Sequence, residues 1–429
     1  MFSRSLARND TARGKRRGLI TALDIGSSKI ACLIGDTDSK GLRVVGAALQ
    51  ESRGVRHGAV VDLDLAEQAI RETVADAEAQ ADARIKHVLI SVNCGRPTNL
   101  SSTASAPING SLVDDQHLRT AIREASSKLM LEGHTTIQRA VISYELDDVR
   151  NVSMPVGMYG ERLEVTASAL ALRTPPLANL VLAVERVGLS VSGALFASTA
   201  SALAVLTEDE MQLGTIVLDM GSGTTSIAVL RKGRLVHADW VPLGSDIVTT
   251  DVASVLGTSL STAERVKCLF GEAMPTPGDI EYINMPKLSD NGAHDALVPR
   301  ALLTQIIQAR LEEMFGLVQK RLKTSGFEMM TGTEIVLTGG ACQQSKISEL
   351  AAQVFKTRVR IARSRSLVGW TNSDCGPEYA AAIGLLLASA NWPPEMLVIH
   401  RPGEAEAPYQ KSSKAALFNN LLGFRKSRK

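Results

Sequence analysis

The sequence predicts a two-lobed α/β protein whose lobes are built on the same strand-turn-strand unit. The stretch Leu19 to Ile34 reads LITALDIGSSKIACLI, and the stretch Thr215 to Leu230 reads TIVLDMGSGTTSIAVL. In each, an apolar strand ends on Leu-Asp-x-Gly-Ser, small or hydroxyl residues follow, and a second apolar strand begins. The aspartates, Asp24 and Asp219, are 195 positions apart (219 − 24). Repetition at that distance indicates two related half-domains rather than a short-period solenoid.

Length and composition are those of a globular chain with two to four domain-sized units, since 45% of the 429 residues are hydrophobic and 21% are charged. The net charge of +2 is too small to attract nucleic acid electrostatically, and we predict no nucleic-acid partner. Five cysteines without a C-x-x-C spacing indicate a reducing compartment and no zinc site. No apolar run reaches the ~18 residues that span a bilayer. The best run, Tyr379 to Ala390, predicts a buried helix.

The two glycine turns have the chemistry of a phosphate site. Glycine allows close backbone approach, turn N–H groups form an anion-binding nest, and the hydroxyls add donors. Two aspartates would repel a polyphosphate unless a cation lies between them, so we predict a hydrated Mg²⁺ held through water by Asp24 and Asp219. The alternative is a structural turn that each aspartate merely caps. The predicted nucleotide-binding residues are Asp24, Gly26, Ser27, Ser28 and Lys29 in the first hairpin, and Asp219, Gly221, Ser222, Gly223, Thr224 and Thr225 in the second.

A third element follows at Glu334 to Ala341, where an apolar run ends in Thr338, Gly339 and Gly340. A tight turn there would place backbone against an adenosine, although Gly-Gly after a strand is usually only a turn. A P-loop is absent, and Ser226 stands where a dinucleotide fingerprint would need its third glycine. Two phosphate hairpins and an adenosine turn in this order resemble the superfamily of actin, sugar kinases and chaperone ATPases. That resemblance implies a duplicated, ribonuclease-H-like actin fold with ATP and Mg²⁺ as cofactors.

Further stretches carry a closer resemblance, which covers almost the whole chain. They are VVGAALQESRGVRHGAVVDLD (Val44 to Asp64), AVERVGLSV (Ala183 to Val191), LFASTASALAVLTEDE (Leu195 to Glu210), SDIVTTDVASVLGTSLSTAERVK (Ser245 to Lys267), VLTGGACQ (Val336 to Gln343) and PEYAAAIGLL (Pro377 to Leu386). The chain resembles the FtsA family of actin-like bacterial cell-division proteins. The Leu-Thr-Glu-Asp-Glu run and the Ala-Glu-x-x-Lys motif do not occur in this form in chaperones or sugar kinases.

The resemblance implies how the chain divides into domains. The expected parts are a basic, disordered N-terminal extension (1–18), a first lobe (19–86 and 173–214), an inserted self-association subdomain (87–172), a second lobe (215–243 and 332–390), a small subdomain near adenosine and the FtsZ tail (244–331), a flexible linker (391–411) and an amphipathic membrane helix (412–429).

Two charged pairs take roles that the resemblance implies. Glu264 and Lys267 are one helical turn apart, and in the family this pair lies against the ribose and adenine. The alternative is a surface ion pair worth a few tenths of a kcal/mol. Arg310 and Glu313 fall on the helix expected from Arg300 to Lys320, where the family binds the FtsZ tail. A solvated charged face would give the same pattern.

The last residues have an apolar stripe with cationic flanks, which is typical of a helix lying in a membrane interface. The predicted membrane contacts are Leu417, Phe418, Leu421, Leu422, Phe424, Arg425 and Lys426. Each basic residue near an anionic leaflet adds roughly 1 kcal/mol. A helix docked on the body is the alternative, but the Pro-rich segment before it has the composition of a linker.

The resemblance therefore implies a peripheral protein on the cytoplasmic face of the cell membrane, at the division septum. It would polymerise, tether FtsZ filaments to anionic lipid and meet other divisome membrane proteins. No residue is identifiable as a water activator, so the expectation is ATP binding with at most weak ATPase activity. The rivals are a chaperone ATPase, which needs a large substrate domain after residue 390, a sugar-kinase-type phosphotransferase, and an ATP-binding scaffold of a pilus or secretion platform.

Overall fold

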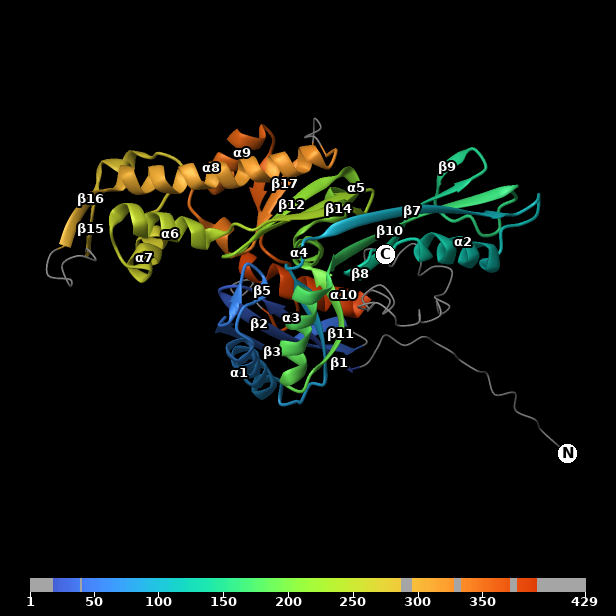
Figure 1. Ribbon diagram of the computed structural model, residues 1–429, viewed down its shortest axis with the longest axis horizontal. Coiled ribbons are helices and arrows are strands. Elements are labelled where there is room, and N and C mark those ends of the chain that lie inside the picture. The colour runs from blue at the N-terminus through green and yellow to red at the C-terminus, as the bar shows by residue number, and fades with distance from the viewer. Residues whose placement is uncertain (1–17, 39–40, 287–294, 328–332, 371–375, 392–429) are drawn as a thin grey trace.

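The computed structural model describes residues 18–38, 41–286, 295–327, 333–370 and 376–391. Two five-stranded sheets form the two lobes (Figure 1). The first runs in the order β11 (Ser190–Phe196), β6 (His87–Val92), β1 (Gly18–Ile25), β2 (Lys29–Asp38), β3 (Gly41–Glu51). The second runs in the order β18 (Val359–Ile361), β17 (Glu334–Thr338), β12 (Thr215–Met220), β13 (Thr225–Arg231), β14 (Arg234–Val241).

The two sheets share one topology. In each, three consecutive strands form an antiparallel meander, and the first of them also pairs in parallel with a later strand that continues the sheet. The duplicated actin-like fold class that the sequence predicts is confirmed. Asp24 and Asp219 hold equivalent places, each the second-last residue of the first strand of its meander.

Helices α1 (Leu63–Ala81) and α3 (Thr174–Arg186) pack with the first sheet, and the short hairpin of β4 (Val55–Arg56) and β5 (Ala59–Val60) precedes α1. Asp62 caps α1 by accepting a hydrogen bond from Leu65 N at 3.0 Å. The buried residues of α1 recur every three or four positions, which gives the apolar stripe that faces the sheet. They are Ala66, Ala69, Ile70, Thr73, Val74, Ala77 and Glu78.

The insert extends to one side of the first lobe as a separate sheet in the order β7, β10, β8, β9, with α2 packed against it (Figure 1). Its elements are β7 (Thr98–Pro107), α2 (Asp115–Ser127), β8 (His134–Leu146), β9 (Val149–Val152) and β10 (Arg162–Arg173). Asn99 anchors the insert to the second lobe, because its side-chain amide donates to Ala238 O at 2.8 Å and accepts from Ala238 N at 2.9 Å.

The expected start of the insert at residue 87 differs from the structure. The strand β6 from residue 87 to 92 pairs in parallel with β1 and β11, so it belongs to the central sheet of the first lobe. The buried apolar run of β6 is typical of such a central parallel strand.

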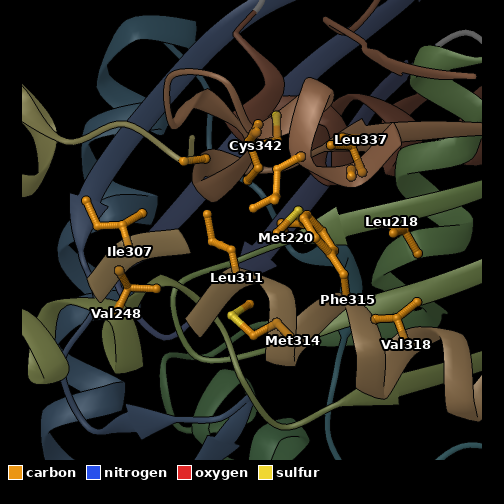
Figure 2. Close-up of a cluster of buried hydrophobic side chains, with 14 of the residues drawn as sticks. Leu218, Met220, Val248, Ile307, Leu311, Met314, Phe315, Val318, Leu337 and Cys342 are labelled. Carbon is orange, nitrogen blue, oxygen red and sulfur yellow. The ribbon is translucent and has the colours of Figure 1, made fainter. Parts of the chain in front are cut away.

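The second lobe carries α5 (Glu208–Leu213) ahead of its sheet and α9 (Ile347–Phe355) after β17. Its small subdomain consists of α6 (Ser245–Leu256), α7 (Leu260–Phe270), a short 3₁₀ turn η1 (Pro277–Ile280), the strands β15 (Tyr282–Pro286) and β16 (Asp295–Pro299), and the long helix α8 (Arg300–Thr324). One hydrophobic core joins this subdomain to the sheet. Figure 2 shows Val248, Leu311 and Phe315 of its helices in one cluster with Met220 and Leu337 of the sheet.

Two helices cross between the lobes. The helix α4 (Ala197–Val205) follows the first sheet but also packs on β12 and β13 of the second, and α10 (Ala380–Asn391) packs on α4, β1, β2 and β6. The buried helix predicted from Tyr379 to Ala390 is therefore confirmed. The helix was expected in the second lobe, but it packs on strands of the first sheet, and its apolar side chains join a core that both sheets share. At the crossing, a Cβ on Gly384 would lie 1.7 Å from Ala200 O.

Among the described residues, no helix is long and apolar enough to cross a membrane. Residues 1–17 and 392–429 lie outside the described part of the chain, and with them the predicted N-terminal extension, almost all of the linker and the predicted membrane helix.

Candidate functional site

The two glycine hairpins meet where the lobes join. Their turns are closed by the same backbone bond, from Gly26 N to Lys29 O at 2.9 Å and from Gly221 N to Thr224 O at 2.8 Å. A Cβ on Gly223 would lie 2.6 Å from Ser27 Oγ, so the turns touch one another. The structure thus brings together two segments that are far apart in the sequence.

Each aspartate accepts a hydrogen bond from a serine on a neighbouring element. Asp24 Oδ1 accepts from Ser91 Oγ at 2.5 Å, and Asp219 Oδ2 accepts from Ser201 Oγ at 2.6 Å. Burial raises the pKa of Asp24, although Lys29 and Ser91 oppose the shift. Burial also raises the pKa of Asp219 to about 6, and repulsion from the Asp24 carboxylate adds to this shift. A cation beside the two carboxylates would offset the cost of burying their charge and the repulsion that Asp219 feels from Asp24.

Lys29 ties the first hairpin to the short 3₁₀ turn η4 (Pro377–Tyr379). Its Nζ donates to the carbonyl oxygen of Glu378 and lies 5.2 Å from the centre of the Tyr379 ring. Burial lowers the pKa of Lys29, whereas Asp24, Glu378 and Asp219 raise it. Lys29 is thus held among carboxylates instead of facing solvent.

Three hydroxyls of the turns have protein partners. Thr224 Oγ1 accepts from Asn93 Nδ2 at 2.5 Å, which links the lobes, and Thr225 Oγ1 donates to Leu243 O at 3.0 Å. Ser27 Oγ accepts from Gly58 N at 3.2 Å. Ser28 is exposed. Of these four, Ser28 is the hydroxyl most open to a ligand.

The Thr-Gly-Gly turn supports Asp219 directly. Thr338 is the parallel partner of Asp219 between β17 and β12. Gly339 has a φ of 84°, and a Cβ there would lie 2.4 Å from Asp219 Oδ1, so glycine is required at this position. Gly339 N and Thr338 Oγ1 both donate to Pro377 O, at 3.1 and 3.3 Å. Gly340 is exposed and begins a short 3₁₀ turn, η3 (Gly340–Gln343).

A small pocket lies next to this turn. Its lining comes from β12, α6, α7, α8 and the residues after Gly340, and it is mainly apolar. The lining residues are Met220, Ser245, Val248, Lys267, Ile307, Leu311, Met314, Ala341 and Gln344. Met220, Val248, Ile307, Leu311 and Met314 are drawn in Figure 2.

Glu264 and Lys267 pair with each other on α7. Lys267 Nζ is 2.6 Å from Glu264 Oε2 and donates to Thr249 Oγ1 at 2.8 Å. Lys267 is only 5% exposed and lines the pocket, whereas half of the Glu264 side chain is open to solvent. Burial raises the pKa of Glu264, but hydrogen bonds from Lys267 and Thr249 outweigh it and hold the pKa below its usual value.

Arg310 and Glu313 lie on α8, within the helix expected there. Arg310 makes a two-pronged ion pair with Asp251 of α6, at 2.5 and 3.0 Å, and a third contact with Glu313 at 2.5 Å. The Asp251 bond raises the pKa of the Arg310 guanidinium. Arg310 therefore joins α6 to α8 in addition to any surface role.

Five residues at the site were not predicted from the sequence: His57, Ser91, Asn93, Ser201 and Glu378. Ser91 and Asn93 lie at and just beyond the end of β6, and their place beside Asp24 follows from the pairing of β6 with β1. Asn93 Oδ1 is buried, and in the described structure it has no hydrogen-bond partner. The signal available in the sequence was the apolar strand from 88 to 92, which carries Ser91 next to its last residue and is followed by Asn93.

The residues fit a magnesium nucleotide. Two half-buried carboxylates offer the oxygen ligands that Mg²⁺ prefers. An orphaned amide oxygen lies at the second hairpin, and Gly339 keeps the space beside Asp219 free of side chain. The small pocket beyond Gly340 is lined mostly by core residues of the second lobe, so it marks the side of the turn next to α7 and does not itself hold a base.

Comparison with known proteins agrees on one family. Residues 216–384 match the family model described as cell division protein FtsA, and residues 95–171 match the SHS2 domain inserted in FtsA. A cell division protein FtsA from Rhizobium meliloti is 36% identical over 386 residues, which is 87% of each chain. The one from Neisseria meningitidis is 35% identical over 86% of this chain and 90% of its own, and the one from Escherichia coli K12 is 31% identical with the same coverage.

Solved structures share the fold at low identity. The PilM-PilN type IV pilus biogenesis complex contains a chain similar to this one with a TM-score of 0.59 and 17% identity, over 88% of this chain and 99% of that one. MreB5 of Spiroplasma citri bound to ADP gives a TM-score of 0.51 and 13% identity, over 87% and 96%. The start of the SHS2 match at residue 95 agrees with the placement of β6 outside the insert.

Proposed function

Because this chain belongs to the FtsA family of actin-like cell division proteins, we propose that it binds ATP with Mg²⁺ between the two glycine hairpins and anchors FtsZ to the membrane. The observation that carries the nucleotide proposal is the contact between the two glycine hairpins, with Asp24 and Asp219 at equivalent places in the strands that lead into them. Buried carboxylates of like charge are retained at functional sites, where a cation or a proton stabilises them.

Each part of the site has a role in this proposal. Asp24 and Asp219 hold Mg²⁺ through its waters, and the turn amides and Ser28 meet phosphate. The base would lie near Gly340 and α7, on the side where Glu264 and Lys267 pair. Magnesium supplies charge neutralisation when bound. The chain offers no evident base, so nucleotide would act chiefly by favouring the closed form of the two lobes and, through it, the polymer.

The membrane and FtsZ parts of the proposal rest on the family and on the sequence. The stripe of Leu417, Phe418, Leu421 and Leu422, with its basic flanks, supports a peripheral anchor at the cytoplasmic face of the membrane at the division septum. The tail of FtsZ would bind on the small subdomain along α8, at Arg310 and Glu313. Self-association would involve the insert. Other divisome membrane proteins are further expected partners.

Calorimetric titration with ATP tests the nucleotide site. The full chain is titrated with and without Mg²⁺, beside Asp24→Asn and Asp219→Asn, which keep the shape of each side chain but remove its charge. We expect Mg²⁺-dependent affinity that each substitution lowers at least tenfold. Equal affinity in all three proteins would contradict the placement of the site.

The FtsZ-tail contact needs a control, because Arg310 also holds α6 to α8. Asp251→Ala removes that ion pair but leaves Arg310 in place. We expect Arg310→Ala and Glu313→Ala to weaken binding of an FtsZ tail peptide severalfold, whereas Asp251→Ala changes it little. If Asp251→Ala weakens binding as much as Arg310→Ala does, the effect of Arg310 is structural and the proposed contact is wrong.

A pilus-type scaffold is the second candidate, since the PilM-PilN complex has the fold. The sequence identity of the pilus protein to this chain is about half that of the division proteins. A pilus-type scaffold would not bind the FtsZ tail, so the peptide experiment separates the two candidates.

A further inference from the structure

His57 reaches from the first lobe to the second glycine hairpin. It lies in the turn between β4 and β5, and its Nδ1 is 2.8 Å from the carbonyl oxygen of Gly223. A carbonyl oxygen only accepts hydrogen bonds, so the histidine nitrogen must carry the proton of this bond. The φ of His57 is 47°, in the left-handed region that residues other than glycine adopt uncommonly. Backbone held in this way persists only where its surroundings determine it.

Close packing fixes the turn that carries His57. Gly58 N donates to Ser27 Oγ in the first hairpin at 3.2 Å. A Cβ on Gly58 would lie 2.4 Å from Asn93 O, and a Cβ on Gly223 would lie 3.0 Å from His57 N. The turn is therefore wedged against both hairpins and the end of β6.

Three successive carbonyls of the second hairpin are held from two different lobes. Gly221 O accepts from Ser245 N at 3.1 Å, and Ser222 O accepts from Asp246 N at 2.9 Å, both at the start of α6 in the same lobe. Gly223 O, the next carbonyl, accepts from His57 in the other lobe. If the lobes move apart, the first two bonds can remain, but the bond to His57 must break.

We infer that His57 is a positioning residue that holds the second glycine hairpin against the first lobe, resists separation of the lobes and thereby slows the loss of bound nucleotide. The last clause rests on the proposed function, whereas the link between the lobes does not. Asn93 makes a separate contact between the lobes at Thr224, so loss of His57 weakens the closed form without abolishing it.

Three substitutions separate the side chain from the backbone strain. His57→Gly removes the donor and relieves the positive φ, and His57→Ala removes the donor but keeps the strain. His57→Asn keeps a donor near the position of Nδ1, and asparagine tolerates this backbone conformation. An effect of the hydrogen bond appears in the Gly and Ala variants but not in the Asn variant. An effect of backbone strain appears as a difference between the His57→Gly and His57→Ala variants.

The first measurement is hydrogen exchange in the nucleotide-free full chain, followed in peptides that cover residues 221–246. Loss of one hydrogen bond predicts about fivefold faster exchange in the Gly and Ala variants, with the Asn variant within twofold of the unmodified protein. Melting temperatures verify that all four proteins are folded. The inference is overturned if the Gly variant exchanges like the unmodified protein, or if the Asn variant exchanges like the Gly variant.

The second measurement is the dissociation rate of a fluorescent ATP analogue with Mg²⁺, after a chase with unlabelled ATP. Release about fivefold faster in the Gly and Ala variants, and near normal in the Asn variant, is expected for the same bond. Equal release from all four proteins would overturn the role in nucleotide retention. If the unmodified protein binds no analogue, the proposed function fails, while the exchange experiment still decides whether His57 links the lobes.

Discussion

The charge of Asp219 is needed for the proposed magnesium site, but it lowers the stability of the nucleotide-free protein. Its carboxylate is partly buried, accepts a hydrogen bond from Ser201, and is repelled by Asp24. Its pKa is raised to about 6 from 3.8, so the folded chain binds more protons than the unfolded chain between these values. The contribution of Asp219 to stability is fully present below pH 3.8 and is lost as the pH rises through 6.

Asp219→Asn should therefore stabilise the nucleotide-free protein at pH 8, because it removes a charge that burial penalises. The gain is on the order of 1–2 kcal/mol once the shift is discounted for partial exposure. Near pH 4, where the carboxyl of the unmodified protein is protonated, the gain should disappear. Melting temperatures of both proteins at the two pH values measure this difference. A gain of the same size at both pH values would show that charge burial is not its cause.

Proton competition at the same carboxyl should govern magnesium binding. Below pH 6, Asp219 must lose its proton before it holds Mg²⁺, so the affinity for Mg²⁺ with ATP should fall by up to tenfold per pH unit. Above pH 7 the affinity should be nearly flat. Titration calorimetry in buffers of different ionisation enthalpy measures the proton release directly. Binding at pH 5.5 without release of a proton would contradict the assignment of Asp219.

Gly339 and Gly340, the neighbouring glycines of the Thr-Gly-Gly turn, provide a test variant and its matched control. Gly339→Ala would place a Cβ 2.4 Å from Asp219 Oδ1 and keep a φ of 84°, so it should displace the carboxylate and weaken ATP binding at least tenfold. A Cβ on Gly340 meets nothing closer than 3.9 Å, so Gly340→Ala should bind ATP nearly normally. Calorimetric titration compares the two variants. Equal affinities would contradict a supporting role for Gly339.

At the residue scale, the repeated Leu-Asp-x-Gly-Ser motif was enough to predict two equivalent hairpins with Asp24 and Asp219 at matching places, because the motif repeats in the same strand context. Their hydrogen-bond partners were not predictable in this way. Ser91 and Ser201 lie on other elements, and only the parallel pairing of β6 and the crossing of α4 bring them to the aspartates.

At the element scale, the crossing of α4 and α10 is the contact that both lobes share. The closeness of the helices depends on Gly384, since a Cβ there would lie 1.7 Å from Ala200 O. Gly384→Ala should force the helices apart and destabilise the fold by about 1–3 kcal/mol. Gly316→Ala in α8 is the matched control, because a Cβ there meets nothing within 4 Å.

In that control, the better helix propensity of alanine should stabilise the protein by up to about 1 kcal/mol. Melting temperatures and urea midpoints compare the two variants. A Gly384→Ala protein as stable as the Gly316→Ala protein would contradict the account of the crossing.

The sequence predicted the existence of most elements better than it predicted their neighbours. The apolar runs of β6 and α10 read correctly as a strand and a buried helix. Their neighbours differ from those expected, since β6 pairs with β1 and α10 packs on the first sheet, because a buried run is apolar whichever sheet covers it. Only the pairing of strands distant in sequence resolves that ambiguity.

At the scale of the whole molecule, two duplicated lobes meet at paired hairpins on one side and at crossed helices on another. Such an arrangement has few covalent connections between its lobes, so a ligand that contacts both hairpins can change the balance between open and closed forms. The insert is held to the second lobe by the two hydrogen bonds between Asn99 and Ala238.

The central claim is that this protein carries FtsZ to a membrane, and co-sedimentation with vesicles tests it most directly. The full chain and a chain ending at Pro408 are each mixed with FtsZ and Mg²⁺-ATP, on anionic and on neutral vesicles. The account predicts that only the full chain pellets, that it does so on anionic lipid, and that FtsZ pellets with it. Equal pelleting of the shortened chain, or FtsZ left in solution while the full chain is on lipid, would contradict the account.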